Sequence, residues 1–311
     1  MAEPVEQLSC IQNRRLEQIV QVQLAPLAAD IGYAPHALVQ AALPYRNSKK
    51  LKAMDAWMVD NGKFSLIVQP GFDRATRKRM DYPTGSLPRL LMFWMATEAK
   101  KKGKPRLELG GSFREFLEKL NLHSKNGGRN SSAQRLKEQM RRLFRAHISF
   151  EYHDATGNVE HERWLDMQIA PKGQVMWSDM YPDTPTLFEN WIELGEYFFE
   201  AITEHAVPVD MRVLKAIQNA PMALDLYNWL TYRSYAAWRR NKTQKVPWPS
   251  IYQQLGSSYN EVRKFRKYAR EHLKLIEQLY PDIRLEEADN CLLIKPARPS
   301  VIPQNHRLSH T

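Results

Sequence analysis

One order of secondary-structure elements occurs twice along the 311 residues of the chain. A long apolar helix is followed by a short strand, a short helix, a polar turn, a basic helix and a two-stranded hairpin. The first copy is predicted at residues 88–99, 106–109, 112–120, 123–130, 131–145, 147–152 and 164–169. The second is predicted at residues 223–240, 245–248, 249–255, 256–258, 260–279, 283–286 and 291–294. This order is typical of a winged helix, the helix-turn-helix variant with a hairpin after its recognition helix.

Apolar positions of the two copies match at a nearly constant spacing. Leu107 precedes Val246, and Phe113 precedes Ile251, by about 138 residues. We therefore predict an α+β fold of two pseudo-duplicated winged-helix domains, mostly helical with short β-hairpin wings. The expected parts are an N-terminal helix and partly flexible arm (1–60), a first winged-helix domain (61–205), a second one (206–295) and a flexible tail (296–311).

The charge of the chain is concentrated around the two basic helices. The formal net charge is +11 at pH 7. Residues 125–145 hold seven Lys or Arg against one acid, and residues 233–274 hold eleven against two. Residues 173–211 between them hold eight acids and no Lys or Arg. Two basic blocks separated by an acidic one favour two modules that bind a polyanion, and a nucleic acid is the expected ligand.

The second basic helix has the two faces that a DNA-reading helix needs. Val262, Phe265 and Ala269 begin an apolar stripe at steps of three or four residues, which would dock the helix on its domain. Arg and Lys form a parallel stripe, and residues near the start of such a helix reach base edges in the major groove. For base edges and nearby phosphates we predict Ser258, Asn260, Arg263, Lys264 and Lys267. For backbone phosphate we predict Arg270 and Lys274, and Tyr259 for stacking or a phosphate contact.

The first basic helix carries a similar but shorter pattern. Leu136, Met140 and Leu143 form its apolar side, and basic residues face away from them. The loop before the helix could hold phosphate through side chains and backbone N–H groups. The residues predicted to contact DNA here are Lys125, Asn126, Arg129, Asn130, Ser131, Ser132, Arg135 and Arg142.

The sequence lacks the motifs of the common enzyme classes. It has no Walker, GxGxxG or GxSxG motif, and its nine histidines show no HxH or HExxH spacing. Cys10 and Cys291 are the only cysteines, which excludes a disulfide framework and a Cys-rich zinc site. We therefore predict no catalytic residue, no metal site and no cofactor. No run approaches the ~18 apolar residues of a membrane span, and residues 1–6 do not resemble a signal peptide, so we expect a soluble protein of the bacterial cytoplasm.

Four segments, in this order, carry a resemblance to a known family. They are YPTGSLPRLL (82–91), LELGGSFREFL (107–117), RLKEQMRRLF (135–144) and ALDLYNWLTYR (223–233). The chain resembles the plasmid-encoded replication initiator (Rep) family over roughly residues 60–295. The resemblance implies a protein that binds repeated sites (iterons) in double-stranded DNA at a plasmid origin. It also implies binding as a monomer, homodimers that repress their own promoter, and recruitment of the host initiator and the replicative helicase.

The expected mechanism is non-catalytic. Both winged helices grip one duplex in successive major grooves, and strain from binding adjacent repeats opens a neighbouring A·T-rich segment. The first winged helix, with the N-terminal helix, is the expected dimerisation surface. Two alternatives stay open at this point: a winged-helix transcriptional regulator without a role in replication, and a rolling-circle nickase.

Overall fold

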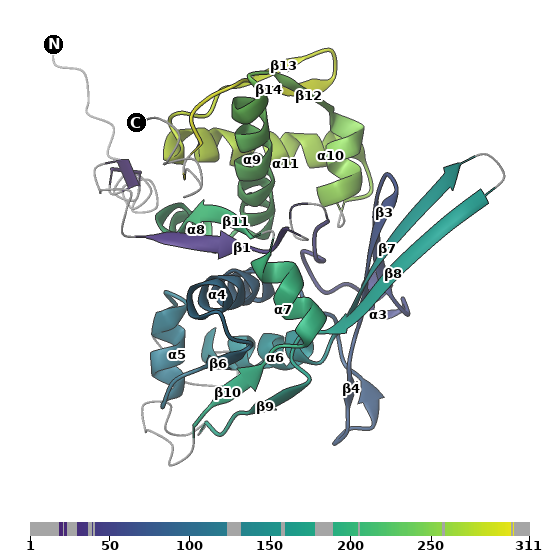
Figure 1. Ribbon diagram of the computed structural model, residues 1–311, viewed down its shortest axis with the longest axis vertical. Helices are drawn as coiled ribbons and strands as arrows, with labels where there is room; N and C mark the ends of the chain where they lie inside the picture. Colours follow the sequence, from purple (N-terminus) through teal and green to yellow (C-terminus); the bar gives the residue numbers. More distant parts are fainter. Residues whose placement is uncertain are drawn as a thin grey trace, which may run out of the picture.

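The computed structural model describes residues 19–20, 22–23, 30–36, 39, 41–122, 132–156, 159–177, 189–204, 206–256, 259–299 and 301. These residues form a mixed α/β structure with two apolar cores. Most elements that carry one core lie in the upper half of Figure 1, around the C-terminal helices, and most that carry the other lie in the lower half. Among the described residues, no helix is both long and apolar enough to span a bilayer.

The upper body contains the second copy of the predicted order of elements. Its helices and strands are α9 (Pro221–Arg240), β12 (Gln244–Pro247), α10 (Trp248–Leu255), α11 (Val262–Leu279), β13 (Leu285–Ala288) and β14 (Cys291–Ile294). The three strands form an antiparallel sheet in the order β12-β14-β13. Val246 and Glu287 both pair with Leu292, so β14 lies in the centre. The elements predicted for this half of the chain are therefore confirmed.

The lower body repeats this arrangement. Its matching elements are α4 (Ser86–Lys102), β6 (Arg106–Glu108), α5 (Phe113–Lys119), α6 (Ser132–Phe144), β9 (Lys172–Gln174) and β10 (Trp191–Glu193). The sheet order is β6-β10-β9, which is again first strand, third strand, second strand. Leu107 and Phe113 are buried in this body as Val246 and Ile251 are in the other. The internal repeat inferred from the sequence thus extends to the pairing of the strands.

Local sequence signals explain where several of these helices begin and end. The Ser112 hydroxyl accepts the backbone N–H of Glu115 (3.2 Å), and the Glu115 carboxylate accepts that of Gly111 (2.8 Å). This reciprocal pair starts α5. Gly103, with φ +64°, ends α4 after three lysines, because the left-handed backbone of a C-cap favours glycine.

The hairpin at residues 147–169, predicted to be the first wing, is a separate ribbon. Strands β7 (His147–Thr156) and β8 (Val159–Gln168) join β2 (Trp57–Asn61) and β3 (Phe64–Gln69) in a sheet of order β2-β3-β7-β8. In Figure 1 the β7–β8 ribbon projects well beyond the body. The assignment was wrong because β7 pairs with β3, where its residue Ile148 faces Val68 in the core. The strand pair equivalent to β13–β14 is β9–β10.

Described residues of the expected N-terminal arm belong to the folded body. Strand β1 (Ile31–Ala34) pairs antiparallel with β11 (Val207–Asp210), and β2 ends at residue 61 inside the four-stranded sheet. The prediction of a partly flexible arm at residues 1–60 does not hold for these segments, because β1 pairs with a strand far along the chain and β2 pairs with the adjacent β3. The division into functional domains stays a prediction. The other elements of the body are α3 (Lys49–Lys52), β4 (Phe72–Asp73), β5 (Lys78–Arg79), α7 (Glu196–Thr203) and α8 (Met211–Ile217).

The start of the expected C-terminal tail is also packed against the body. Val301 is buried, and the Tyr280 hydroxyl donates to the carbonyl of Arg298 (3.0 Å). The tail predicted at 296–311 is thus anchored at Arg298 and Val301, and residues 300 and 302–311 lie outside the described part of the chain.

A buried ion pair connects the two bodies. The guanidinium of Arg89, on α4, donates to both carboxylate oxygens of Asp225, on α9, at 2.7 and 2.8 Å. Both side chains are almost inaccessible to solvent. Arg89 also donates to the carbonyls of Leu43 (2.6 Å) and Gly85 (2.7 Å). Its hydrogen-bonding groups are therefore matched, as a buried charge requires.

Candidate nucleic-acid interface

Helix α11 is amphipathic in the way that its sequence predicts. Phe265, Ala269 and Leu273 are buried against the upper core. The opposite side of the helix is exposed and basic, and its exposed cations are Arg263, Lys264, Lys267, Arg270 and Lys274. The helix begins at Val262, two residues later than expected, so Asn260 lies in the exposed turn before it.

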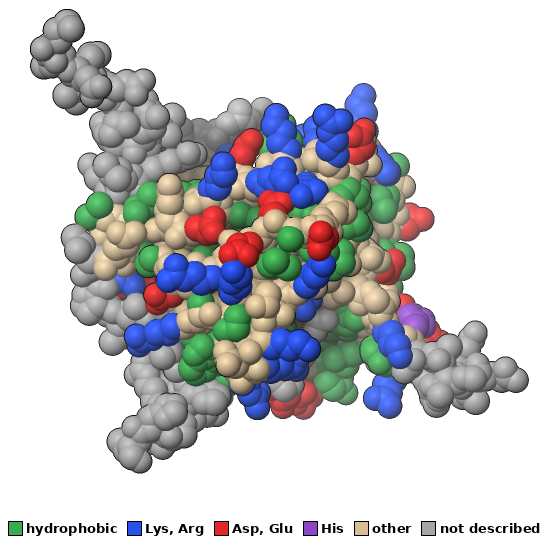
Figure 2. Space-filling model, turned by 90° about the horizontal axis from the view of Figure 1, so that it is seen from above, with side chains coloured by type: hydrophobic (Ala, Val, Ile, Leu, Met, Phe, Trp, Pro, Cys, Tyr) green, Lys and Arg blue, Asp and Glu red, His purple; other side chains and the backbone are tan. Residues whose placement is uncertain are grey.

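A groove of about 1000 Å³ runs between α11 and the β13–β14 hairpin. The basic side chains that line it are Arg263, Arg266, Lys267, Arg270 and Lys274. Figure 2 looks onto this end of the molecule and shows many Lys and Arg side chains with Asp and Glu among them. Four acids, Glu271, Glu277, Glu286 and Glu287, line it as well, so the groove between the helix and the hairpin carries charges of both signs with a small excess of cations.

Glu287, on β13, connects the hairpin to α11 through hydrogen bonds. It accepts hydrogen bonds from Arg270 (2.7 and 2.6 Å) and from Arg266 (2.7 Å). These hydrogen bonds lower the pKa of Glu287 to about 2, and those from Arg270 make the largest contribution. Arg266 also donates to the side-chain oxygen of Asn290 (2.7 Å) and lies over the ring of Trp248. The two arginines thus set the position of the β13–β14 hairpin relative to the helix.

The remaining cations of α11 are available to a ligand. Within the described residues, no carboxylate forms an ion pair with Arg263, Lys264, Lys267 or Lys274. Arg270, predicted to bind phosphate, is instead paired with Glu287 in this structure. The pairing could not be predicted from α11 alone because the acid lies on a different element.

Tyr259, predicted to stack on a base or contact phosphate, packs instead against other aromatic rings of the protein. Its ring contacts those of Phe265, Tyr268 and Tyr45, with centroids 5.7–6.3 Å apart. Its backbone carbonyl accepts the hydroxyl of Tyr252 (2.6 Å). Burial raises the pKa of the Tyr259 phenol. Ser258, the other residue predicted here, lies outside the described part of the chain.

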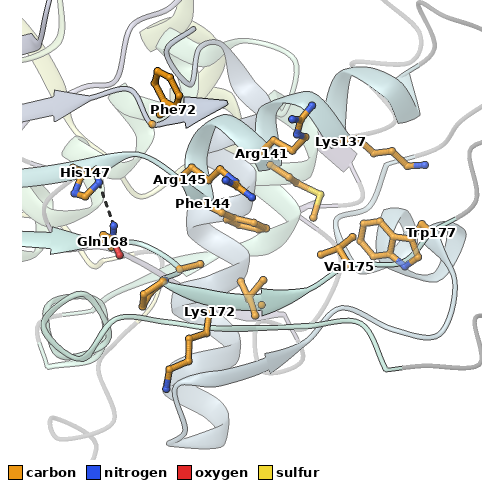
Figure 3. Close-up of a pocket in the computed structure, with 16 residues that line it drawn as sticks. Phe72, Lys137, Arg141, Phe144, Arg145, His147, Gln168, Lys172, Val175 and Trp177 are labelled. Carbon is orange, nitrogen blue, oxygen red and sulfur yellow. Dashed lines mark hydrogen bonds between the residues drawn. The ribbon is translucent and has the colours of Figure 1, made fainter. Parts of the chain in front are cut away.

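A second groove, of about 790 Å³, lies beside α6 in the lower body. Helix α6 buries Leu136, Met140 and Leu143 as its sequence predicts. Figure 3 shows Arg141, Arg145 and Lys137 of α6 around this groove, with Lys172 of β9 on the other side. Phe72, Phe144, Val175 and Trp177 provide its apolar lining. The α6 groove therefore lies between the basic helix and the second strand of its sheet, as the α11 groove does.

Comparisons with known proteins agree with this architecture. A family model described as plasmid encoded RepA protein matches residues 82–249, which is more than half of the chain. The chain belongs to this RepA family. No curated protein matches the sequence at a significant level.

Solved structures similar to this RepA-family chain come from RctB. A selenomethionine crystal structure of domains 2 and 3 of RctB matches with a TM-score of 0.51 and 13% identity, covering 85% of this chain and 96% of that one. A second crystal structure of RctB domains 2-3 overlaps more loosely, with a TM-score of 0.41, 14% identity, and coverage of 83% and 94%. At this identity the first match indicates a shared fold.

The predicted residues around α6 have mixed outcomes in this RepA-family chain. Arg135 is exposed on the helix. Arg142 is not available as predicted: its side chain is 14% exposed and pairs with Glu138 (2.9 Å) and Asp81 (3.3 Å). Ser132 begins α6, and nothing of its side chain is described. The predicted residues outside the described part of the chain are Lys125, Asn126, Arg129, Asn130 and Ser131.

Several groove residues were missed by sequence reasoning. Arg141 and Arg145 stand four residues apart, a spacing that places both on one side of α6 and could have found them. Lys172 lines the α6 groove and Arg266 lines the α11 groove because of how their elements pair and pack with others. No local sequence signal points to either residue.

The described residues contain one three-residue group with metal-ligand chemistry. Glu151, His153 and Glu162 bring their side-chain atoms within 4.8 Å of one another on the β7–β8 ribbon. Nε2 of His153 lies 3.3 Å from a carboxylate oxygen of Glu151, and His153 and Glu162 are exposed. The expectation of a protein without metal or cofactor stays a prediction.

Proposed function

We propose that this chain is a sequence-specific double-stranded DNA-binding initiator of plasmid replication that recognises repeated origin sites through two winged-helix units. Membership of the RepA family supports the role in replication. The helix–wing grooves described above support DNA as the ligand.

The α11 groove is the observation that carries the proposal. An α-helix fits the major groove of B-DNA, and Arg and Lys side chains reach guanine edges and phosphates from it. Arg263, Lys264 and Lys267 lie in the first two turns of α11, exposed and without an acidic partner among the described residues. We assign them, with Asn260, to base edges and nearby phosphates.

Other cations have supporting roles in the proposal. Lys274 lies further along α11 and is assigned to backbone phosphate. Arg270 and Arg266 hold the wing through Glu287, so that its hairpin can lie against the DNA. In the first unit, Arg135 and Arg145 of α6 take the corresponding place in the next major groove, while Arg141, paired with Asp73 (3.3 Å), holds the β4–β5 hairpin beside the helix.

The same proposal covers the steps that follow binding. Occupation of adjacent repeats bends the DNA, and deformation is least costly at flexible A·T-rich steps, where we place strand opening. The protein then acts by binding alone, without cleavage of the DNA. Homodimer formation, repression of its own promoter, and contacts with the host initiator and helicase stay predictions from the family resemblance.

A direct test compares α11 variants on a labelled duplex that carries one origin repeat. Arg263→Ala and Lys267→Ala should each weaken binding about 5- to 150-fold, which corresponds to ~1–3 kcal/mol for a base contact. Lys215→Ala, an exposed lysine of α8, is the matched control and should bind as the wild type does. Wild-type affinity for both α11 variants in fluorescence anisotropy would contradict the assignment of this helix.

Two further measurements separate the alternative functions. A plasmid that carries the origin should be lost from cells when Arg263→Ala or Lys267→Ala replaces the wild type. Retention of that plasmid would favour a regulator of transcription. Relaxation of supercoiled origin DNA by the purified protein in Mg²⁺ would favour a nickase and contradict the binding-only mechanism.

A further inference from the structure

A short basic hairpin, β4–β5, projects from the lower body. Figure 1 shows it pointing away from the rest of the molecule. Its strands pair Phe72 with Arg79 and Asp73 with Lys78. Residues 72–79 contain four Lys or Arg and a single acid. The neighbouring groove lining contains Gly71 and Phe72 of this hairpin together with Arg141 and Arg145 of α6.

The base of the hairpin is held firmly. Arg79 donates to the carbonyls of Met54 (2.6 Å) and Lys52 (2.7 Å). The backbone N–H of Met80 donates to the carbonyl of Gly71 (2.8 Å). The backbone of Gly71 also lies so close to α6 that a Cβ added there would come within 2.3 Å of the carbonyl oxygen of Arg145. The hairpin therefore has a defined position beside the helix.

The single acid of the hairpin is used inside the protein. Asp73 accepts the backbone N–H of Ala75 (2.9 Å) and the guanidinium of Arg141 (3.3 Å). Chiefly the bond from Ala75, and in smaller part the charge of Arg141, lower the pKa of Asp73. Asp73 thus shapes the turn and ties it to α6, and it forms no ion pair with the basic residues of the tip.

Three cations remain at the tip. Arg74, Arg77 and Lys78 are exposed, and no side chain in the described part of the protein forms a hydrogen bond or ion pair with theirs. Arg77 has a left-handed backbone, with φ 54°. Glycine is favoured at such a position, and a non-glycine residue there costs roughly 1–2 kcal/mol. The chain thus keeps a guanidinium where local folding alone would favour glycine, and such a departure suggests a function.

We propose that the β4–β5 hairpin binds the sugar–phosphate backbone of double-stranded DNA next to the α6 groove. The inference rests on the proposed function, because it takes the same duplex as its ligand. Cations on a projecting turn suit phosphates, which line the edge of each DNA groove and accept hydrogen bonds from Arg and Lys. These contacts fix the position of α6 on the duplex and add affinity without reading the sequence.

The test measures how salt weakens binding. Each phosphate contact contributes about −0.9 to the slope of log K against log salt concentration for B-DNA. Fluorescence anisotropy of the full chain on origin and unrelated duplexes, from 50 to 200 mM KCl, gives this slope. The variant combines Arg74→Ala, Arg77→Gly and Lys78→Ala. The control removes the same charge at exposed sites outside the hairpin, through Lys101→Ala, Lys104→Ala and Lys215→Ala.

The expected result is a slope shallower by about 2.7 for the hairpin variant than for the control. Between 50 and 200 mM KCl, the hairpin variant should therefore lose about 40-fold less affinity than the control. The weakening should be equal for origin and unrelated DNA. Equal slopes for the hairpin variant and the control would overturn the proposal, as would a loss confined to origin DNA. If the wild type failed to prefer origin DNA, the proposed function itself would be contradicted.

A single substitution separates folding from binding. Arg77→Gly relieves the left-handed strain, so the unfolding midpoint in urea should stay the same or rise. The same substitution should still reduce the salt slope by about 0.9, because one phosphate contact is lost. An unchanged slope in this well-folded variant would also overturn the proposal.

Discussion

The buried pair of Arg89 and Asp225 allows a sharp test of how the two bodies are joined. In Asp225→Asn, the amide occupies the same space but removes the negative charge. Its NH₂ group also turns a donor toward a guanidinium that has only donors. Loss of a proton offers no relief, because an arginine guanidinium stays protonated in proteins. The variant therefore leaves a buried charge uncompensated.

The two partners should respond differently to loss of the other. Removing one side of a buried pair costs about 3–5 kcal/mol, and we expect Asp225→Asn to show that loss at every pH near neutrality. In Arg89→Met the remaining carboxyl can take up a proton instead. Burial already raises the pKa of Asp225 beside Arg89, and loss of Arg89 raises it further.

The pH dependence follows from this raised pKa. A carboxyl whose pKa is higher in the folded state than in the unfolded state destabilises the fold as pH rises between the two values. The destabilisation in Arg89→Met should therefore grow by about 1.4 kcal/mol for each pH unit from pH 5 upward, until Asp225 ionises. Urea unfolding of both variants and the wild type at pH 5, 6 and 7, followed by circular dichroism, measures these differences.

Two results would refute this reasoning. One is a loss below about 1 kcal/mol for Asp225→Asn, since a fully buried, unpaired guanidinium cannot cost so little. The other is an Arg89→Met variant whose loss of stability is the same at pH 5 and pH 7.

Three other predictions concern the interface. Arg270→Ala should weaken DNA binding less than threefold, far less than Lys267→Ala, because Glu287 already neutralises Arg270 and Arg266 still holds Glu287 and its hairpin; anisotropy titrations compare them. The low pKa of Glu287, about 2 against an ordinary 4.5, means that its contribution to stability is present above pH 4.5 and lost toward pH 2. The wild type should therefore lose its advantage in melting temperature over Glu287→Gln across that range. Gly71→Ala should cost about 1–3 kcal/mol in urea unfolding, because its Cβ would overlap the carbonyl of Arg145.

The helices were the part of the fold that sequence could predict. The 3.6-residue spacing of Phe265, Ala269 and Leu273 identified the buried side of α11, and Ser112 with Glu115 located the start of α5. These signals are local, so each can be recognised without knowledge of the rest of the chain.

Strand pairing was harder because the partners are remote. The alternation in residues 147–152 is equally compatible with a wing and with a strand of another sheet, and only its pairing with β3 distinguishes them. For the same reason nothing in residues 31–34 indicates that β11 completes their sheet. The side-chain pairs that correct the site, Arg142 with Asp81 and Arg270 with Glu287, likewise join separate elements.

The β7–β8 ribbon leaves and re-enters the first repeat at almost one point. The backbone N–H of Ala170 donates to the carbonyl of Phe144 (3.4 Å), so the chain returns beside the end of α6 before β9 begins. Beyond the residues of β7 that pair with β3, an excursion closed in this way can grow or shrink without moving α6 or β9. The outer part of the ribbon is thus a place where the length of the chain can change while the groove between α6 and β9 keeps its shape.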